Sequence, residues 1–144
     1  MRVPSKGRQS GTQWYNVFMN ANDDPLQVRE LNHIAIHVRD LQASEHFYGD
    51  TLGLPHLPRP DFSFPGAWFA FGSQELHLLV DPARRRDERT TVHFALLVGD
   101  AYAAHAELVK RGVPILGGPA PRPDGAVQVF FSDPDGYVIE MVSV

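Results

Sequence analysis

The feature that most constrains the fold of this chain is an internal repeat at an offset of 60 residues. The segment LNHIAIHVRD at residues 31–40 is matched by TVHFALLVGD at residues 91–100, with histidine, alanine, valine and aspartate at equivalent positions. A helical pattern and then strand patterns follow each copy. One such unit alone would leave a face of its sheet uncovered, so the repeat predicts two units that pair into one curved, cleft-forming sheet.

The repeat also predicts how the chain is organised. We expect an N-terminal extension at residues 1–30, followed by one domain at residues 31–144 that contains the copies 31–81 and 91–144. The extension carries a small aromatic and apolar cluster that begins at Trp14. It is interpreted as a loose or helical segment that packs on the domain or on a partner.

A charged connector, DPARRRDERT at residues 81–90, joins the two copies. Its simplest interpretation is a solvated linker. The alternative is that Arg84–Arg86 or Arg89 contacts an anionic group of a substrate, because a guanidinium group suits the recognition of carboxylates and phosphates.

Composition excludes several classes of protein. At 144 residues, 43% of them hydrophobic, the chain suits one globular domain with a real core. The net charge of −4 gives no electrostatic footprint for nucleic acid, and no apolar run approaches the ~18 residues of a membrane helix. The absence of cysteine excludes a disulfide framework and a thiolate ligand. We therefore expect a cytoplasmic protein that acts on a small molecule and binds neither nucleic acid nor membrane.

The first copy has a strand, a helix and two further strands in its pattern. These elements are expected at residues 31–38, 41–54, 67–71 and 75–80. The first strand alternates, with His33, Ala35 and His37 on one face and apolar residues on the other. Asp40 is expected to cap the helix and Gly53 to end it, and a proline-rich loop follows.

The second copy repeats this order and ends in a hairpin. Its elements are expected as a strand within 91–100, a helix at 101–112, a Gly/Pro loop at 117–125 and the hairpin at 127–144. Residues 132–136, SDPDG, supply the turn of the hairpin. Its second strand is apolar except for Glu140, and a lone carboxylate is costly to bury unless a positive group lies opposite. We expect that group to be a metal ion.

Four side chains are expected to meet in the cleft. Repeat symmetry places His33 and His93 at the same point of the first strand in each copy, and His77 and Glu140 lie on the last strands. Three imidazoles and one carboxylate suit one divalent ion such as Zn²⁺, Ni²⁺, Mn²⁺, Fe²⁺ or Co²⁺. The alanine two residues after each first-strand histidine leaves room for a substrate.

Other interpretations of these side chains stay open. A histidine on a strand is often a hydrogen-bonded core residue instead of a ligand. His77 is either a fourth ligand or a substrate contact, and His37 can line the cavity. The remaining histidines are expected at the surface: His46, His56 and His105. Four aromatic side chains of the first copy either fill the core or line a ligand groove: Phe62, Phe64, Trp68 and Phe69.

The segments LNHIAIHVRDLQASEHFYGDTLGL, ELHLLV, TVHFALLV and FFSDPDGYVIEMV together resemble the glyoxalase / bleomycin-resistance / dioxygenase family, the vicinal oxygen chelate superfamily. The resemblance implies an α+β fold of two paired βαβββ modules, which form a curved, cleft-lined mixed sheet around a divalent metal ion. The family's ligands carry over onto His33, His93 and Glu140. The fourth ligand position, often Glu or Gln in isomerases and epimerases of the family, falls on His77 and departs from a standard glyoxalase I.

The resemblance further implies a metal-dependent lyase or isomerase that acts on a small α-oxo or α-hydroxy compound through an enediolate-type intermediate. The metal would act as a Lewis acid on two neighbouring substrate oxygens. Glu140 is the first candidate for the base, and His77 or His37 is the second. A homodimer is expected, because partners commonly cover the edges of such sheets, and the modules can pair within a chain or across the dimer.

Three other functions are alternatives within the same resemblance. Cationic residues facing the metal would favour a thiol transferase similar to the fosfomycin-resistance enzymes. A wide aromatic groove without a metal would favour a drug-binding module. The set of two histidines and one glutamate is also found in extradiol-type dioxygenases, of which this chain would be a small example.

Overall fold

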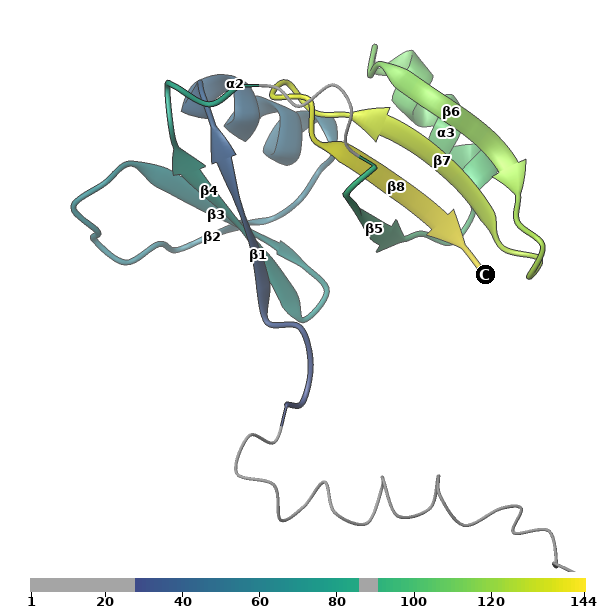
Figure 1. The fold of residues 1–144 in the computed structure, drawn as a ribbon, viewed down its shortest axis with the longest axis horizontal. Helices are drawn as coiled ribbons and strands as arrows, with labels where there is room; N and C mark the ends of the chain where they lie inside the picture. Colours follow the sequence, from purple (N-terminus) through teal and green to yellow (C-terminus); the bar gives the residue numbers. More distant parts are fainter. Residues whose placement is uncertain (1–27, 86–90) are drawn as a thin grey trace, which may run out of the picture. The chain divides into compact units, whose positions relative to one another are not determined.

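The computed structural model describes residues 28–85 and 91–144 (Figure 1). The aromatic cluster near Trp14 and two of the connector arginines, Arg86 and Arg89, lie outside the described residues. By its internal contacts the chain divides into Met1–Leu31 and Asn32–Val144, and every helix and strand described below belongs to the second unit.

The first module is a four-stranded mixed sheet with a helical segment. Its elements are β1 His33–Val38, α2 Leu41–Glu45, the π-helix η1 His46–Thr51, β2 His56–Leu57, β3 Gly66–Phe71 and β4 Gln74–Val80. The strands lie in the order β1-β4-β3-β2. β1 is parallel to β4, and the other two pairs are antiparallel.

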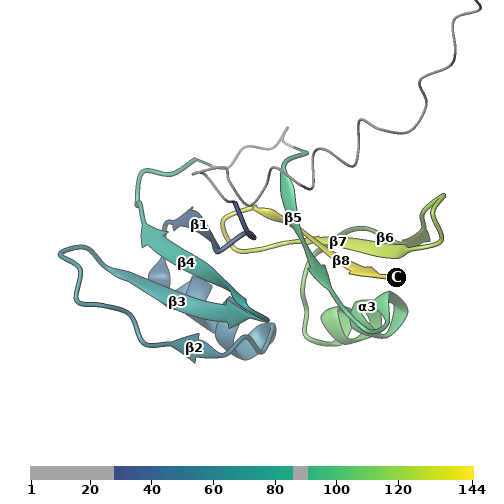
Figure 2. The ribbon, with the colours of Figure 1, turned by 90° about the horizontal axis from the view of Figure 1, so that it is seen from below.

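The second module has the same topology. Its elements are β5 His93–Leu97, α3 Ala101–Lys110, β6 Ile115–Pro121, β7 Val127–Ser132 and β8 Val138–Ser143. The strands lie in the order β5-β8-β7-β6, with β5 parallel to β8. In both modules the helix packs against one face of its own sheet (Figure 2). The two mixed sheets with few helices confirm the predicted α+β class.

Asp40 caps the first helical segment, as predicted, and its repeat equivalent Asp100 caps the second. Asp40 accepts a hydrogen bond from the backbone N–H of Ala43 at 3.1 Å, and Asp100 accepts one from that of Tyr102 at 2.8 Å. Gly53 and Gly112 follow the two helical ends with φ of 75° and 72°. In the described part of the chain, no helix is long and apolar enough to span a bilayer.

The first helical segment differs from the single α-helix expected over residues 41–54. After one α-turn it widens into η1, where the N–H of Leu52 donates to the carbonyl of Phe47 at 2.8 Å, five residues back. Phe47 and Tyr48 are both buried. Two consecutive aromatic side chains of this segment thus enter the core, which a strict 3.6-residue period does not reveal.

The Gly/Pro loop expected at residues 117–125 is wrong in its first part, because β6 continues to Pro121. The pairing of β6 with β7 shifts register between Ile115 and Gly117 and again between Gly117 and Ala120. β6 lies at the edge of its sheet, where proline is tolerated because only one side of the strand needs ladder hydrogen bonds. The short strand β2 likewise lies within the proline-rich segment that we expected to be a loop.

One core serves both modules. Its buried side chains come from the two sheets and both helical segments, and Phe47 of the first module lies 6.5 Å from Phe131 of the second, between ring centroids. On β1 the predicted alternation is confirmed, since Ile36 and Val38 are buried and the His33 face is exposed.

Polar contacts join the β7–β8 turn of the second module to the first module. Tyr48 donates its hydroxyl hydrogen to Oδ2 of Asp133 at 2.7 Å, and Arg39 donates from Nε to Oδ1 of Asp135 at 2.7 Å. Both aspartates are buried. Burial is the largest cause that raises the pKa of Asp133, and burial also raises the pKa of Tyr48 well above its usual value. These contacts fix the turn that leads into β8.

Candidate active site

The first module presents two imidazoles side by side. His33 on β1 and His77 on β4 stack with ring centroids 4.3 Å apart and planes 16° from parallel. Nδ1 of His33 lies 2.8 Å from the amide oxygen of Asn32. Because that oxygen only accepts, Nδ1 carries the hydrogen and Nε2 keeps a lone pair, which is the arrangement of a metal-ligating histidine.

His77 has a different set of partners. Its Nε2 lies 2.7 Å from Oε2 of Glu75, so that nitrogen donates to the carboxylate and Nδ1 is left with a lone pair. The indole of Trp68 stacks on the other side of the ring at 4.0 Å and 5°. Glu75 was not among the predicted site residues. The signal for it was its position two residues before His77, on the same face of a strand.

The second module pairs an imidazole with a carboxylate. Nδ1 of His93 donates to the backbone carbonyl of Thr91 at 2.8 Å, and its Nε2 lies 3.0 Å from Oε2 of Glu140. Phe130 contacts the imidazole edge-on at 5.4 Å between centroids. The carbonyl of Thr91 therefore fixes the orientation of the His93 ring, and Nε2 faces the carboxylate of Glu140. Metal-ligating histidines are commonly oriented in this way.

Glu140 is the most unusual group in the site. Its side chain is only 6% exposed, and Oε1 accepts no hydrogen bond from any residue that the structure describes. Nη1 of Arg122 lies 3.8 Å from Oε1, while Nη2 of the same guanidinium is held by Asp124 at 2.6 Å. A buried carboxylate oxygen without a donor indicates a missing partner.

The donors of both modules fit a divalent ion. Imidazole nitrogens and a carboxylate oxygen are the usual ligands of Zn²⁺ and related ions, at about 2.0–2.2 Å. Two neighbouring ligands of one ion at such distances lie about 3 Å apart, as Nε2 of His93 and Oε2 of Glu140 do here, at 3.0 Å. A bound cation would provide the partner that Oε1 of Glu140 lacks among the described residues.

The four predicted ligands form two half-sites within one chain. His33 meets His77, and His93 meets Glu140, but the described residues contain no group of three histidine, aspartate or glutamate side chains placed to hold one ion. The sequence left open whether the modules pair within a chain or across a dimer, and the four side chains do not meet within the described residues of one chain. Their role as ligands stays a prediction, and it requires that the half-sites come together.

The other histidines lie apart from both half-sites. His37 is exposed, and its Nδ1 lies 3.9 Å from Oδ2 of Asp81. His46 and His56 are exposed, as predicted, whereas His105 on α3 is half-buried. Of the connector arginines within the described residues, Arg84 packs its guanidinium over the ring of Tyr137 at 3.9 Å.

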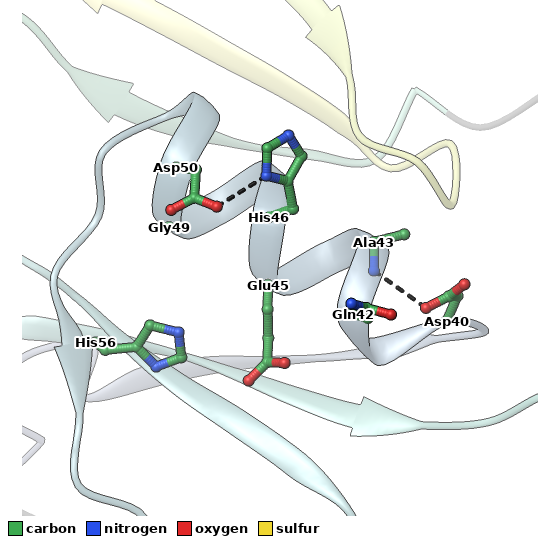
Figure 3. A pocket seen from close by; sticks show the side chains of 8 residues that line it. All are labelled: Asp40, Gln42, Ala43, Glu45, His46, Gly49, Asp50 and His56. Atoms are coloured by element: carbon green, nitrogen blue, oxygen red, sulfur yellow. Dashed lines mark hydrogen bonds and ion pairs between the residues drawn. The ribbon is translucent and has the colours of Figure 1, made fainter.

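A separate hollow of about 570 Å³ lies on the outer side of the α2–η1 segment (Figure 3). It is open and lined by polar side chains, and none of the four predicted ligands lines it. Figure 3 shows that two of its carboxylates already serve the helix, because Asp40 caps Ala43 and Asp50 pairs with His46 at 2.8 Å. We therefore place the candidate active site at the half-sites, where a buried carboxylate oxygen, Oε1 of Glu140, lacks a hydrogen-bond donor among the described residues.

Two modules of equal topology, each with a histidine at the start of its first strand and a histidine or glutamate on its last strand, define a duplicated α+β fold. The chain matches the Glyoxalase/Bleomycin resistance protein/Dioxygenase superfamily over residues 30–141. It belongs to this superfamily, as the sequence resemblance predicted.

Similar proteins lie in the same superfamily. The chain is 29% identical to Glyoxylase I 4 of Arabidopsis thaliana over 82% of this chain and 72% of that protein. It is 30% identical to a probable lactoylglutathione lyase of Synechocystis sp. over 78% of this chain and 93% of that protein. A crystal structure of a glyoxalase family protein from Bacillus anthracis matches with a TM-score of 0.71 and 28% identity, over 81% of this chain and 95% of that one.

Proposed function

We propose that this protein is a metal-dependent lyase or isomerase that acts on a small α-oxo or α-hydroxy compound. The observation that carries the proposal is the buried Glu140, whose Oε1 lacks a hydrogen bond while its Oε2 faces Nε2 of His93. The similarity to lactoylglutathione lyases supports a lyase of the glyoxalase type. Two neighbouring oxygen atoms define the substrate in this proposal.

Three side chains would hold the ion, and His77 would have another task. His33, His93 and Glu140 each keep a free nitrogen lone pair or an unpaired oxygen for a cation. When bound, a divalent ion supplies Lewis acidity that stabilises negative charge on the substrate oxygens. His33 and His93 are oriented for this role by the oxygens that accept from their Nδ1 atoms.

The proton transfer is assigned to His77. The sequence favoured Glu140 as the base, but in this proposal Glu140 binds the ion beside His93 and is not free to accept a proton. His77 instead donates from Nε2 to Glu75, so the lone pair of Nδ1 is available for a proton next to the substrate carbonyl. Glu75 would hold the ring in this tautomer and stabilise the imidazolium that forms.

A second copy of the chain would complete the site. On β5 the exposed face carries His93, Ala95 and Leu97, and Leu97 is 73% exposed. The matching face of β1, with His33 and Ala35, is exposed as well. We propose a homodimer in which the first module of one chain faces the second module of its partner, so that each His33–His77 pair meets a His93–Glu140 pair.

Metal content and its dependence on both half-sites test this proposal. Protein purified without chelator is expected to contain about one divalent ion per chain, and both His33→Ala and Glu140→Ala should lose it. His46→Ala removes an exposed imidazole outside the site and should keep the ion. The metal-loaded protein is then assayed with hemithioacetals of α-oxo aldehydes, with His77→Ala expected to bind metal but to turn over slowly. Absence of metal after incubation with Ni²⁺, Mn²⁺, Zn²⁺ and Fe²⁺ would refute the proposal.

A thiol transferase is the second candidate. The chain is 27% identical to metallothiol transferase FosB of Bacillus licheniformis, over 77% of this chain. Arg122 beside Glu140 supplies a cation next to the predicted metal, as an anionic substrate would require. Formation of a thiol adduct from fosfomycin by the metal-loaded protein, followed by mass spectrometry, distinguishes this activity from the lyase activity.

A further inference from the structure

Three aromatic side chains of the first module form a partly exposed surface that the proposed chemistry does not use. Phe62 and Phe64 lie in the loop between β2 and β3 and are 43% and 45% exposed. Their rings stack at 5.3 Å and 23°, and Phe62 lies 6.0 Å from the half-buried Trp68 on β3. We call Phe62, Phe64 and Trp68 the aromatic shelf. Large apolar side chains gathered on a surface indicate a binding function.

The aromatic shelf is continuous with the His33–His77 half-site. Trp68 lies opposite His77 in the β3–β4 ladder, and the two rings are nearly parallel, 4.0 Å apart. His77 in turn stacks on His33 at 4.3 Å. A row of rings therefore leads from the exposed phenylalanines to the imidazoles that would face the substrate.

The loop that carries the shelf is held in place by Arg59. Its guanidinium lies 4.8 Å and 4.9 Å from the ring centroids of Phe62 and Phe64, and its Nη2 donates to the carbonyl of Phe64 at 2.8 Å. Gly66 allows this close packing, since a Cβ there would overlap the carbonyl oxygen of Leu78 and lie 3.3 Å from Nε of Arg59. The contacts of Arg59 and the close packing at Gly66 therefore fix the shape of the aromatic shelf.

We propose that the aromatic shelf binds a planar aromatic group of the substrate, which places the neighbouring oxygens of that substrate at the His33–His77 half-site. The substrate class is then an α-hydroxy or α-oxo compound that carries an aryl group. Flat rings pack well on the faces of Phe and Trp in offset or edge contacts, and such pairs add to the burial of apolar area. This inference rests on the proposed function only for the position of the oxygens.

Paired ligands with and without the ring test the proposal. Mandelate and lactate share the α-hydroxy acid group and differ in a phenyl against a methyl substituent. Binding is measured by calorimetry and by Trp68 fluorescence in a Trp14→Phe background, since the chain has two tryptophans. Mandelate is expected to bind at least about tenfold more tightly than lactate, both with Mn²⁺ present and with chelator.

The shelf variant is Phe62→Ala/Phe64→Ala. Both side chains are exposed, so the protein should stay folded, as circular dichroism checks. The preference for mandelate is expected to fall to within about threefold of lactate. Tyr102→Ala is the matched control, because Tyr102 is an aromatic side chain of α3 that is 53% exposed and lies outside the shelf. This control should keep the full preference.

Three results would overturn the proposal. The first is equal affinity for mandelate and lactate, and the second is an unchanged preference in the double variant. The third is self-association that the double variant abolishes, which would assign the shelf to a second copy of this chain. Failure of the proposed function is seen separately, because a protein without metal or turnover would still prefer mandelate, whereas a metal-loaded active enzyme without that preference contradicts this inference alone.

Discussion

In the first module the last-strand residue that lies opposite Ala35 is His77, and in the second module the residue opposite Ala95 is Glu140. The next strand repeats the correspondence, with Trp68 opposite His77 and Phe130 opposite Glu140. The two half-sites therefore occupy equivalent positions in the two modules. What differs is the side chain at each position.

One substitution between the modules accounts for much of the difference. Glu75 lies opposite His33, and the residue opposite His93 is Val138. In the first module the carboxylate of Glu75 accepts a hydrogen bond from Nε2 of His77. In the second module Oε1 of Glu140 accepts no hydrogen bond from the described residues, and Nη1 of Arg122 lies 3.8 Å away. The repeat therefore determines the backbone arrangement of both modules. The chemical differences between the half-sites come from positions at which the two copies carry different side chains.

The prediction with the largest expected effect tests whether the two modules are equally important for stability. Phe69 and Phe131 follow Trp68 and Phe130, and both are fully buried. Phe69→Ala and Phe131→Ala should each lower the free energy of unfolding by about 3–5 kcal/mol, because each leaves a cavity in the shared core. Urea unfolding followed by circular dichroism measures this. A loss confined to one variant, or two separate transitions, would show that the modules do not share one core energetically.

The second prediction separates the roles of the two carboxylates. Glu140→Gln should weaken metal binding by at least about 100-fold, since it removes a ligand, and even supporting residues commonly contribute 10–100-fold. Glu75→Gln should leave metal affinity within about threefold but lower kcat at least about tenfold, because Glu75 acts through His77. Competition against a chromophoric chelator measures affinity. Equal losses of affinity in both variants would remove the distinction between the half-sites.

The third prediction concerns the contact that joins the modules. Tyr48→Phe leaves Oδ2 of the buried Asp133 without its hydroxyl donor. The free energy of unfolding should fall by about 1–3 kcal/mol, the usual cost of an unsatisfied buried group. The control is Tyr102→Phe, which removes an exposed hydroxyl from α3 and should change stability little. A neutral result for Tyr48→Phe would mean that the turn is held by its other contacts.

The smallest effect is a dependence of stability on pH. Burial is the largest cause that raises the pKa of Asp133, so the folded state favours the protonated carboxyl. This contribution to stability is present below the unfolded pKa of about 4 and is lost as pH rises through the folded value. Relative to Asp133→Asn, the wild-type protein should therefore lose stability between pH 4 and pH 7. Urea midpoints across that range measure the difference, and parallel curves would contradict it.

Much of the fold could be predicted from the sequence because it depends on short-range sequence patterns. The alternation of β1, the cap at Asp40 and the turn before β8 depend on residues within one or two turns of each other. The boundaries that failed depend on tertiary neighbours. β6 remains a strand through Pro121 because it needs a partner on one side only. The π-helix includes two adjacent aromatic side chains that are both buried in the core.

The sequence nominated the four candidate residues of the site, but it did not predict which of them pair. The isolated Glu140 and the equivalent positions of His33 and His93 indicated a metal before any fold was known. The engagement of Nε2 of His77 by Glu75 depends on rotamers, which residue spacing does not specify. Arg122 reaches Glu140 from the end of β6, a strand that was expected to be a loop. Phe69, considered for a ligand groove, is fully buried in the core.

The unpaired Oε1 of Glu140 has a consequence for how long the protein survives. A buried oxygen without a hydrogen-bond donor lowers the stability of the chain by about 1–3 kcal/mol, and in the proposed metal-bound state the cation would return that free energy and add its own binding term. The population of unfolded chains would then rise when metal becomes scarce. Because proteases act on that population, the abundance of the protein would follow the metal supply without a dedicated sensor.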